Sequence, residues 1–219
     1  MTPIAPAFLA GHSLGEYSAL VAAGSLDFES AVGLVHARGR FMQEAVPEGR
    51  GAMTAIVGCG PEEVLAACQA AEDASGGVVA PANFNSPSQI VISGDAAAVE
   101  LAGNEAHRRG AKRAIPLAVS APFHCSLMEP AAEKLAGELG RVCFSDARIP
   151  VVTNVEAQPN SDGSRIAELL RRQVTAPVRF TESVQCLAKL GVTQLLEIGP
   201  GRVLSGLVAR IDRGFERLG

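Results

Sequence analysis

The first fifty residues combine one short apolar run with two stretches of helical spacing. The pattern predicts a buried strand over residues 6–10, a tight turn over 11–15, and helices over about 16–23 and 28–45. Gly24 suits the end of the first helix, and Asp27 suits the N-cap of the second. The second helix is expected to stop before Pro47, because proline disfavours helical backbone at the residue before it.

The next seventy residues change character and predict a self-contained unit. The expected elements are a strand over 52–57, a helix over 61–71, strands over 78–83 and 89–93, a helix over 95–109 and a strand over 112–117. This β-α-β-β-α-β order is typical of a ferredoxin-like fold. We therefore predict a small ferredoxin-like domain over residues 51–117, inserted into a larger domain.

The rest of the chain returns to helices alternating with strands. Helices are expected over 127–139, 164–173 and 181–190, strands over 151–154 and 194–198, and a last helix after Gly199-Pro200-Gly201. Such alternation favours a mainly parallel sheet. We predict a large α/β domain made of residues 1–50 and 118–219.

Composition narrows the class of protein. The 219 residues are 47% hydrophobic and 19% charged, which favours a globular chain, and the net charge of −4 argues against a nucleic-acid partner. No apolar run is long enough for a membrane span, and residues 1–10 lack the charged leader of a signal peptide, so we expect a cytoplasmic protein. The five cysteines have no metal-binding spacing, which predicts buried, reduced thiols and no metal site.

A G-x-S-x-G sequence, Gly11-His12-Ser13-Leu14-Gly15, lies between the first predicted strand and helix. In that setting the glycines permit a strained turn that exposes the serine hydroxyl as a nucleophile. The Leu14 N–H and the following helix N-terminus would stabilise an oxyanion. The alternative is a turn with a purely structural role.

A nucleophilic serine needs a base, and the chain has four histidines. His12 adjoins Ser13, and adjacent side chains on such a turn diverge. His36 and His107 fall on polar helix faces. His124 lies just past a predicted strand end, where loops carry chemistry, so we predict that it is the general base.

An arginine interrupts the apolar side of the second helix. The stripe at helical spacing consists of Phe28, Ala31, Val35 and Met42. Arg38 falls on this stripe, whereas Arg40 falls on the polar side. A guanidinium that points inward needs an anion as its partner. The partner is either a structural carboxylate or a substrate carboxylate bound through two hydrogen bonds. The remaining alternative is a side chain that bends so that its charged end reaches solvent.

Several sequence blocks together resemble a known family. They are GHSLGEYSAL, HARGRFMQEAVPEGRGAM, NFNSPSQIVISG, VSAPFHCSLMEPA and EIGPGRVL. In this order and spacing they resemble malonyl-CoA:acyl carrier protein transacylase and, more distantly, the acyltransferase domains of polyketide and fatty-acid megasynthases. The resemblance covers essentially the whole chain.

The resemblance implies a ping-pong mechanism. Ser13 would take malonyl from malonyl-CoA with His124 as base, and the phosphopantetheine thiol of acyl carrier protein would then accept it. Arg38 would hold the malonyl carboxylate, and the backbone carbonyl of Gln173 would orient His124. Phe123 resembles the form associated with malonyl rather than methylmalonyl preference.

The resemblance also implies an α/β-hydrolase-like large domain, no bound cofactor and a monomer. Met42 and Asn85 are weaker candidates for the pocket wall, since packing and turn formation explain both.

Members of the family begin with a strand and a Gly-Gln-Gly-Ser-Gln loop that lies well upstream of the serine and supplies a second oxyanion donor. The sequence starts twelve residues before Ser13, without that loop. We therefore expect a shortened chain with poor activity, because loss of one oxyanion donor costs roughly 10²–10³ in rate.

Two rival hypotheses remain open at this stage. An α/β-hydrolase-type thioesterase or esterase shares the G-x-S-x-G turn, but its chain order is serine, acid, histidine. The second rival is an inactive fragment that binds acyl carrier protein without turnover.

Overall fold

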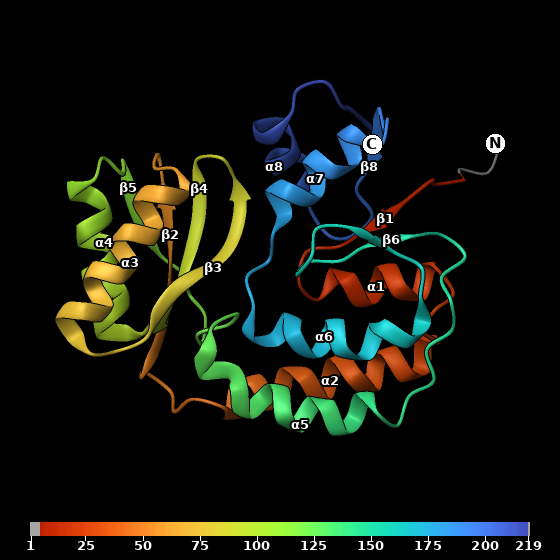
Figure 1. Ribbon diagram of the computed structural model, residues 1–219, viewed down its shortest axis with the longest axis horizontal. Coiled ribbons are helices and arrows are strands. Elements are labelled where there is room, and N and C mark those ends of the chain that lie inside the picture. The colour runs from red at the N-terminus through yellow and green to blue at the C-terminus, as the bar shows by residue number, and fades with distance from the viewer. Residues whose placement is uncertain (1–4, 219) are drawn as a thin grey trace.

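The computed structural model describes residues 5–218, which form two lobes side by side (Figure 1). None of the helices in this part of the chain is long and apolar enough to cross a membrane.

The smaller lobe is a four-stranded sheet with two helices on one face (Figure 1). Its elements are β2 (Gly51–Val57), α3 (Pro61–Ser75), β3 (Val79–Ser86), β4 (Gln89–Asp95), α4 (Ala96–Arg108) and β5 (Arg113–Pro116). The strand order is β3-β4-β2-β5, and all neighbours are antiparallel. The predicted order of elements over residues 51–117 is therefore observed.

Successive side chains of β2 and β4 point to opposite faces of the sheet, and apolar residues lie on both faces. One face, with Ile56, Ile90 and Ile92, packs under α3 and α4. The opposite face forms a small cluster of Met53, Ala55, Ala82 and Val91, against which Phe123 packs. Phe123 also packs against the core of the larger lobe, so its ring lies at the junction of the two lobes.

The larger lobe carries most of the helices. Its elements up to residue 175 are β1 (Leu9–Ala10), α1 (Gly15–Ala22), α2 (Phe28–Glu44), the 3₁₀ turn η1 (Ser126–Met128), α5 (Glu129–Leu139), β6 (Val151–Val152), β7 (Pro159–Asn160), η2 (Gly163–Arg165) and α6 (Ile166–Thr175). Helices α1, α2, α5 and α6 enclose one buried core. A second core forms around α7 (Phe180–Lys189), β8 (Gln194–Leu196), α8 (Val203–Ile211) and β9 (Glu216–Leu218).

The large parallel sheet that the sequence suggested is reduced to short pairings among the described residues. β1 and β6 run parallel over two residues each, β7 joins β6 in antiparallel fashion, and β8 pairs with β9. The expected strand over 151–154 ends at Val152, and Asn154 beyond it turns its side chain to the serine turn.

Backbone hydrogen bonds tie the two lobes together. The Phe84 N–H donates to the Val178 carbonyl oxygen (2.9 Å), and the Val178 N–H donates to that of Ala82 (2.8 Å). The segment that follows α6 therefore pairs with edge strand β3 through a parallel bridge between Asn83 and Val178.

The predicted apolar stripe of α2 was wrong at Phe28, which is 74% exposed. Phe28 is the first residue of the helix, where neighbouring elements no longer cover it. The buried side is instead made by Ala31, Leu34, Arg38, Phe41 and Met42. The inward position of Arg38 is therefore observed.

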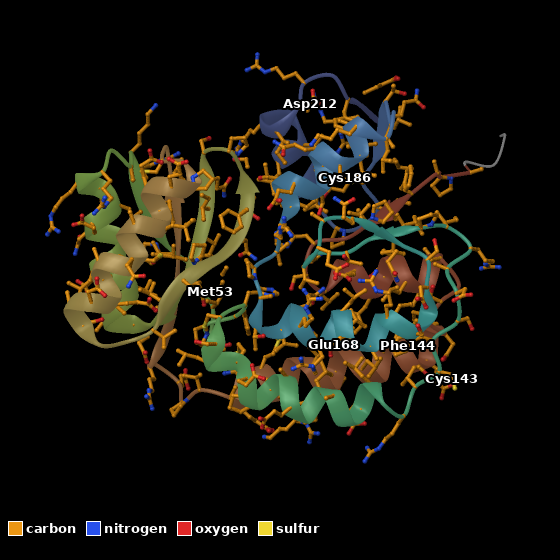
Figure 2. All side chains as sticks on the ribbon, in the orientation of Figure 1. Met53, Cys143, Phe144, Glu168, Cys186 and Asp212 are labelled. Atoms are coloured by element: carbon orange, nitrogen blue, oxygen red, sulfur yellow. The ribbon has the colours of Figure 1, made fainter. Side chains whose placement is uncertain are left out.

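Four of the five free cysteines are buried, as expected, but Cys143 is exposed. It lies in the loop after α5, at the edge of the larger lobe, whereas Cys186 lies within α7 (Figure 2).

Candidate functional site

The G-x-S-x-G sequence forms a sharp turn between β1 and α1. A Cβ atom at Gly11 would lie 2.0 Å from the Gly15 carbonyl carbon, so only glycine permits this close approach. Ser13 has φ of +52°, a left-handed conformation that is strained for a non-glycine residue. The turn therefore holds the serine in a conformation that the surrounding contacts must maintain.

Asn154 supplies two of those contacts. Its Oδ1 accepts a hydrogen bond from the Ser13 N–H (2.7 Å), and its Nδ2 donates to the Gly11 carbonyl oxygen (2.7 Å). One side chain from beyond β6 thus satisfies backbone groups on both sides of His12, and braces the strained turn.

Ser13 and His124 meet although 111 residues separate them in the chain. The Ser13 Oγ lies 2.7 Å from His124 Nε2, and the Nδ1 of the same ring lies 2.8 Å from the Gln173 carbonyl oxygen. Because a carbonyl oxygen only accepts, Nδ1 must carry the proton, which leaves Nε2 of the neutral ring to accept from the Ser13 hydroxyl. His124 also has a positive φ, of +60°.

Burial keeps this imidazole neutral. His124 is 4% exposed, and desolvation lowers its pKa to about 3, with a further lowering from the nearby Arg38 charge and an opposing effect from the bond to Gln173. A neutral imidazole at ordinary pH can accept a proton.

The Arg38 guanidinium reaches the same hydroxyl from α2. Its Nη2 donates to Ser13 Oγ (2.9 Å) and to Gln173 Oε1 (3.3 Å), while its buried Nε has no hydrogen-bond partner among residues 5–218. Within that part of the chain, no carboxylate lies within 4.0 Å of Arg38 in an ion pair. Desolvation lowers its pKa, yet arginine stays protonated in proteins, so the site holds a buried cation with unused donor capacity.

A buried acidic group, Glu16, lies in the first turn of α1 and is 2% exposed. Its Oε2 accepts from the Asn154 N–H (2.9 Å) and from Gln173 Nε2 (2.8 Å). Burial raises the pKa of Glu16 to about 7, against the opposing effects of those two hydrogen bonds and of the Arg38 charge.

Tyr17 and His12 are two further ring side chains next to the site. Tyr17 lies under the guanidinium, with Arg38 Cζ 5.9 Å from its ring centre, and burial raises its pKa to about 12. His12 turns away from Ser13: its Nε2 donates to Asn85 Oδ1 (2.8 Å) on β3, and its ring lies tilted against that of Phe180, with the ring centres 5.5 Å apart.

The structure thus brings Ser13, His124, Arg38 and Gln173 together. Asn85 contacts the turn through the ring of His12. Met42 is buried in the core of the larger lobe, and Phe123 is half-buried next to His124. The Leu14 side chain is 48% exposed, and its N–H, just before α1, bonds to no acceptor within residues 5–218.

Sequence reasoning missed Glu16, Asn154 and the side-chain role of Gln173. Polar residues inside an apolar pattern were a signal for Glu16, which directly precedes the buried Tyr17. Asn154 follows an apolar strand and gave no signal of its own.

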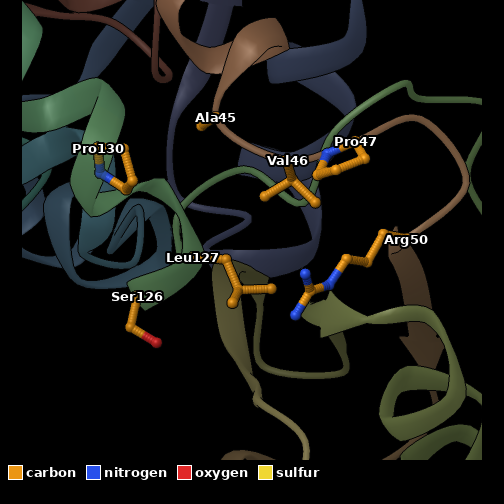
Figure 3. A pocket seen from close by; sticks show the side chains of 7 residues that line it. All are labelled: Ala45, Val46, Pro47, Arg50, Ser126, Leu127 and Pro130. Carbon is orange, nitrogen blue, oxygen red and sulfur yellow. The ribbon is translucent and has the colours of Figure 1, made fainter.

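A hollow of about 280 Å³ is lined by residues other than those of the candidate site (Figure 3). It is lined by Ala45, Val46, Pro47 and Arg50 from the segment after α2, by Ser126 and Leu127 of η1, and by Pro130 of α5. Ser13 does not line it, so the candidate site is located by the contacts of Ser13. No cluster of three potential metal ligands occurs within residues 5–218.

Comparison with known proteins identifies relatives of the whole chain. A model of the acyl transferase domain family matches residues 3–216. The chain is 55% identical over 207 residues to the malonyl CoA-acyl carrier protein transacylase of Escherichia coli (strain K12), covering 94% of this chain and 66% of that protein. It is 53% identical over 215 residues to the protein of the same name from Bacillus subtilis (strain 168), covering 98% and 68%.

Solved structures show the same likeness. An acyl carrier protein S-malonyltransferase from Vibrio cholerae matches with a TM-score of 0.95 at 51% identity, over 98% of this chain and 69% of that one. A malonyl-transacylase solved in complex with its type II PKS acyl-carrier protein matches with a TM-score of 0.96 at 51% identity, over 99% and 69%.

The fold and the serine–histidine site define an α/β protein of the acyl transferase class. The chain belongs to the malonyl-CoA:acyl carrier protein transacylase family. It spans about two thirds, 66%, of the length of the first of these relatives.

Proposed function

We propose that this chain transfers a malonyl group from malonyl-CoA to the phosphopantetheine thiol of acyl carrier protein, through an ester on Ser13. The observation that carries the proposal is the buried Arg38 guanidinium, which bonds to the Ser13 hydroxyl and has no carboxylate in an ion pair within residues 5–218. A cation at the nucleophile selects an acyl group that brings its own carboxylate. Malonyl is such a group.

In the first half-reaction, Ser13 Oγ attacks the thioester carbonyl while His124 Nε2 takes the hydroxyl proton. The bond from Ser13 Oγ to the malonyl carbonyl carbon forms, the carbon–sulfur bond breaks, and coenzyme A leaves with the proton from His124. The Gln173 carbonyl keeps the proton on His124 Nδ1 and so keeps Nε2 aimed at Ser13. The Leu14 N–H, which bonds to no acceptor within residues 5–218, is the candidate donor to the oxyanion.

In the second half-reaction, the thiol of acyl carrier protein replaces the serine oxygen. His124 takes the thiol proton and returns it to Ser13 as the ester breaks, so the enzyme is regenerated. In both half-reactions the bonds and protons balance with Ser13, His124 and the two thiols alone.

Phe123 is the candidate specificity residue. Its ring packs between the core of the larger lobe and the inner face of the small sheet, directly before His124. A bulky ring there leaves little space for a branch at the malonyl α-carbon. Met42 and Asn85 remain candidates for more distant parts of the pocket wall.

We also infer that residues 51–117 form a ferredoxin-like small domain and that residues 1–50 and 118–219 form an α/β-hydrolase-like large domain. The strand order β3-β4-β2-β5, with α3 and α4 on one face, supports the first assignment. The turn of Ser13 between β1 and α1 supports the second.

The test separates transfer from hydrolysis. The chain is loaded with malonyl-CoA, and coenzyme A release is followed with and without acyl carrier protein that bears phosphopantetheine. Release that depends on the carrier, with malonyl recovered on the carrier, is expected. Equal release to water without the carrier would favour a thioesterase, and carrier binding without any release would favour an inactive fragment.

A further inference from the structure

Within residues 5–218, Glu16 is the one buried acid in contact with this network, and the mechanism above does not use it. Its carboxylate is 2% exposed, and two of its neighbours, Gln173 and Asn154, are also almost fully buried. An acid that stays buried requires compensating hydrogen bonds, and here Oε2 has two of them, from Gln173 Nε2 (2.8 Å) and the Asn154 N–H (2.9 Å).

The bond to Gln173 fixes how that side chain is turned. Its Nε2 donates to Glu16 and to the Ser13 carbonyl oxygen (3.1 Å), and its Oε1 accepts from Arg38 Nη2 (3.3 Å). Arginine only donates and a carbonyl oxygen only accepts, so the amide has one orientation that satisfies its three partners. The same residue offers its main-chain carbonyl to His124 Nδ1 (2.8 Å).

The bond to Asn154 fixes the serine turn. The Asn154 N–H donates to Glu16, and the Asn154 side chain holds the Ser13 N–H (2.7 Å). One carboxylate oxygen is therefore a single residue away from each of the three groups that act on the substrate: Ser13, His124 and Arg38.

We propose that Glu16 is a positioning residue, whose acceptor oxygen sets the Ser13 turn through Asn154 and both His124 and Arg38 through Gln173. The inference rests on the proposed function for its consequence on malonyl selection. Its consequence for Ser13 reactivity is independent of that function.

What Gln173 and Asn154 require is an acceptor, not a charge. A protonated carboxyl group or a glutamine amide retains such an oxygen. With the pKa of Glu16 raised to about 7, both the charged and the neutral form occur near neutral pH, and both keep the network. Glu16→Gln should therefore preserve the site, whereas Glu16→Met, of similar size but without an acceptor, should not.

The experiment compares the parent, Glu16→Gln and Glu16→Met, with Glu100→Gln, an exposed position on α4, as the matched control. A fluorophosphonate probe reports the reactivity of Ser13 without any malonyl substrate. Acylation by malonyl-CoA and by acetyl-CoA then reports the selectivity that Arg38 supplies. Thermal unfolding monitored by circular dichroism shows whether each variant is folded.

Glu16→Gln and the control should react with the probe within about threefold of the parent, and Glu16→Met should react roughly 30- to 100-fold more slowly, because a small displacement of catalytic groups costs that much. The malonyl preference over acetyl should fall in Glu16→Met and persist in Glu16→Gln. A Met variant that matches the parent would overturn the proposal, as would a Gln variant as impaired as the Met variant.

If Glu16→Met does not fold, Glu16→Asp takes its place, since it withdraws the acceptor by one methylene from both partners. A slowed reaction of the folded Asp variant is then expected, and a parental rate would overturn the proposal. If the parent reacts with the probe but takes no malonyl, the proposed function fails while the positioning role of Glu16 is still judged by the probe.

Discussion

Arg38 Nη2 lies 2.9 Å from Ser13 Oγ, and His124 Nε2 lies 2.7 Å from the same oxygen. The hydroxyl donates its proton to the imidazole and accepts a hydrogen bond from the guanidinium. A base and a buried cation therefore share one nucleophile, and this relationship links acid–base chemistry to the choice of acyl group.

Replacing the cation should change selectivity more than reactivity. Arg38→Ala should lower the rate of Ser13 acylation by malonyl-CoA about 100-fold, since hydrogen bonds to a charged partner contribute roughly 1.5–3 kcal/mol. Acylation by acetyl-CoA, which brings no carboxylate, should change far less. Mass spectrometry of the acyl-enzyme measures both rates.

Arg40→Ala is the control for Arg38→Ala, because Arg40 is exposed on the same helix. Equal losses for malonyl and acetyl in Arg38→Ala would show that Arg38 supports the fold or the nucleophile rather than the substrate carboxylate.

The pH dependence of Ser13 reactivity should lack the ordinary histidine step. The base works when neutral, and burial lowers the pKa of His124 from 6.5 to about 3, so the neutral form persists as the pH falls through 6.5. The fluorophosphonate reaction should therefore vary by less than about threefold between pH 8 and pH 5. A fall of roughly tenfold per pH unit below pH 6.5 would mean that His124 has an ordinary pKa.

Phe123 should limit the size of the acyl group. Phe123→Ser opens space beside His124, and the ratio of methylmalonyl to malonyl acylation should rise roughly tenfold or more, the range expected when a pocket gains room for one methyl group. Phe28→Ser removes an exposed ring on α2 and should leave the ratio unchanged. An unchanged ratio in Phe123→Ser, with the variant folded, would assign the ring to packing between the lobes alone.

Glu16 should also make the free energy of unfolding depend on pH. Its pKa is about 7 in the folded chain and 4.5 as an isolated group, so the folded state binds this proton more tightly. That contribution is fully present below pH 4.5 and is lost as the pH rises through 7. Between those limits the free energy of unfolding of the parent should fall by roughly 3 kcal/mol relative to Glu16→Gln.

Denaturant unfolding of the parent and of Glu16→Gln at several pH values measures that difference. The shifted pKa of His124 affects the stability of both proteins equally and cancels in the comparison. A constant difference from pH 4.5 to pH 9 would mean that the Glu16 carboxyl is ionised throughout, as an exposed glutamate is.

Much of the fold could be predicted because local signals were strong. Asp27 caps α2 by accepting from the Ser30 N–H, Gly24 follows the end of α1 in a left-handed conformation, and Pro61 opens α3, which runs four residues past its expected end at residue 71. The chain order of strands and helices in the smaller lobe followed from alternating apolar positions. The short pairing of β1 with β6 did not follow, because residue patterns do not give the length over which two distant segments pair.

Some residues of the candidate site could be predicted from the sequence and others could not. Ser13, His124 and Arg38 each carried a local signal: a glycine-flanked turn, a loop histidine and a cation on an apolar face. Asn154 carried none, and the polar position of Glu16 within an apolar pattern did not identify its partners, because the contacts of both residues span more than 130 positions of the chain.

The most direct measurement is peptide mapping by mass spectrometry after the chain is mixed with malonyl-CoA, with Ser13→Ala as the control. The account predicts one malonyl group, carried on Ser13, and none on the control. No adduct on the folded parent, or the same adduct on Ser13→Ala, would contradict it.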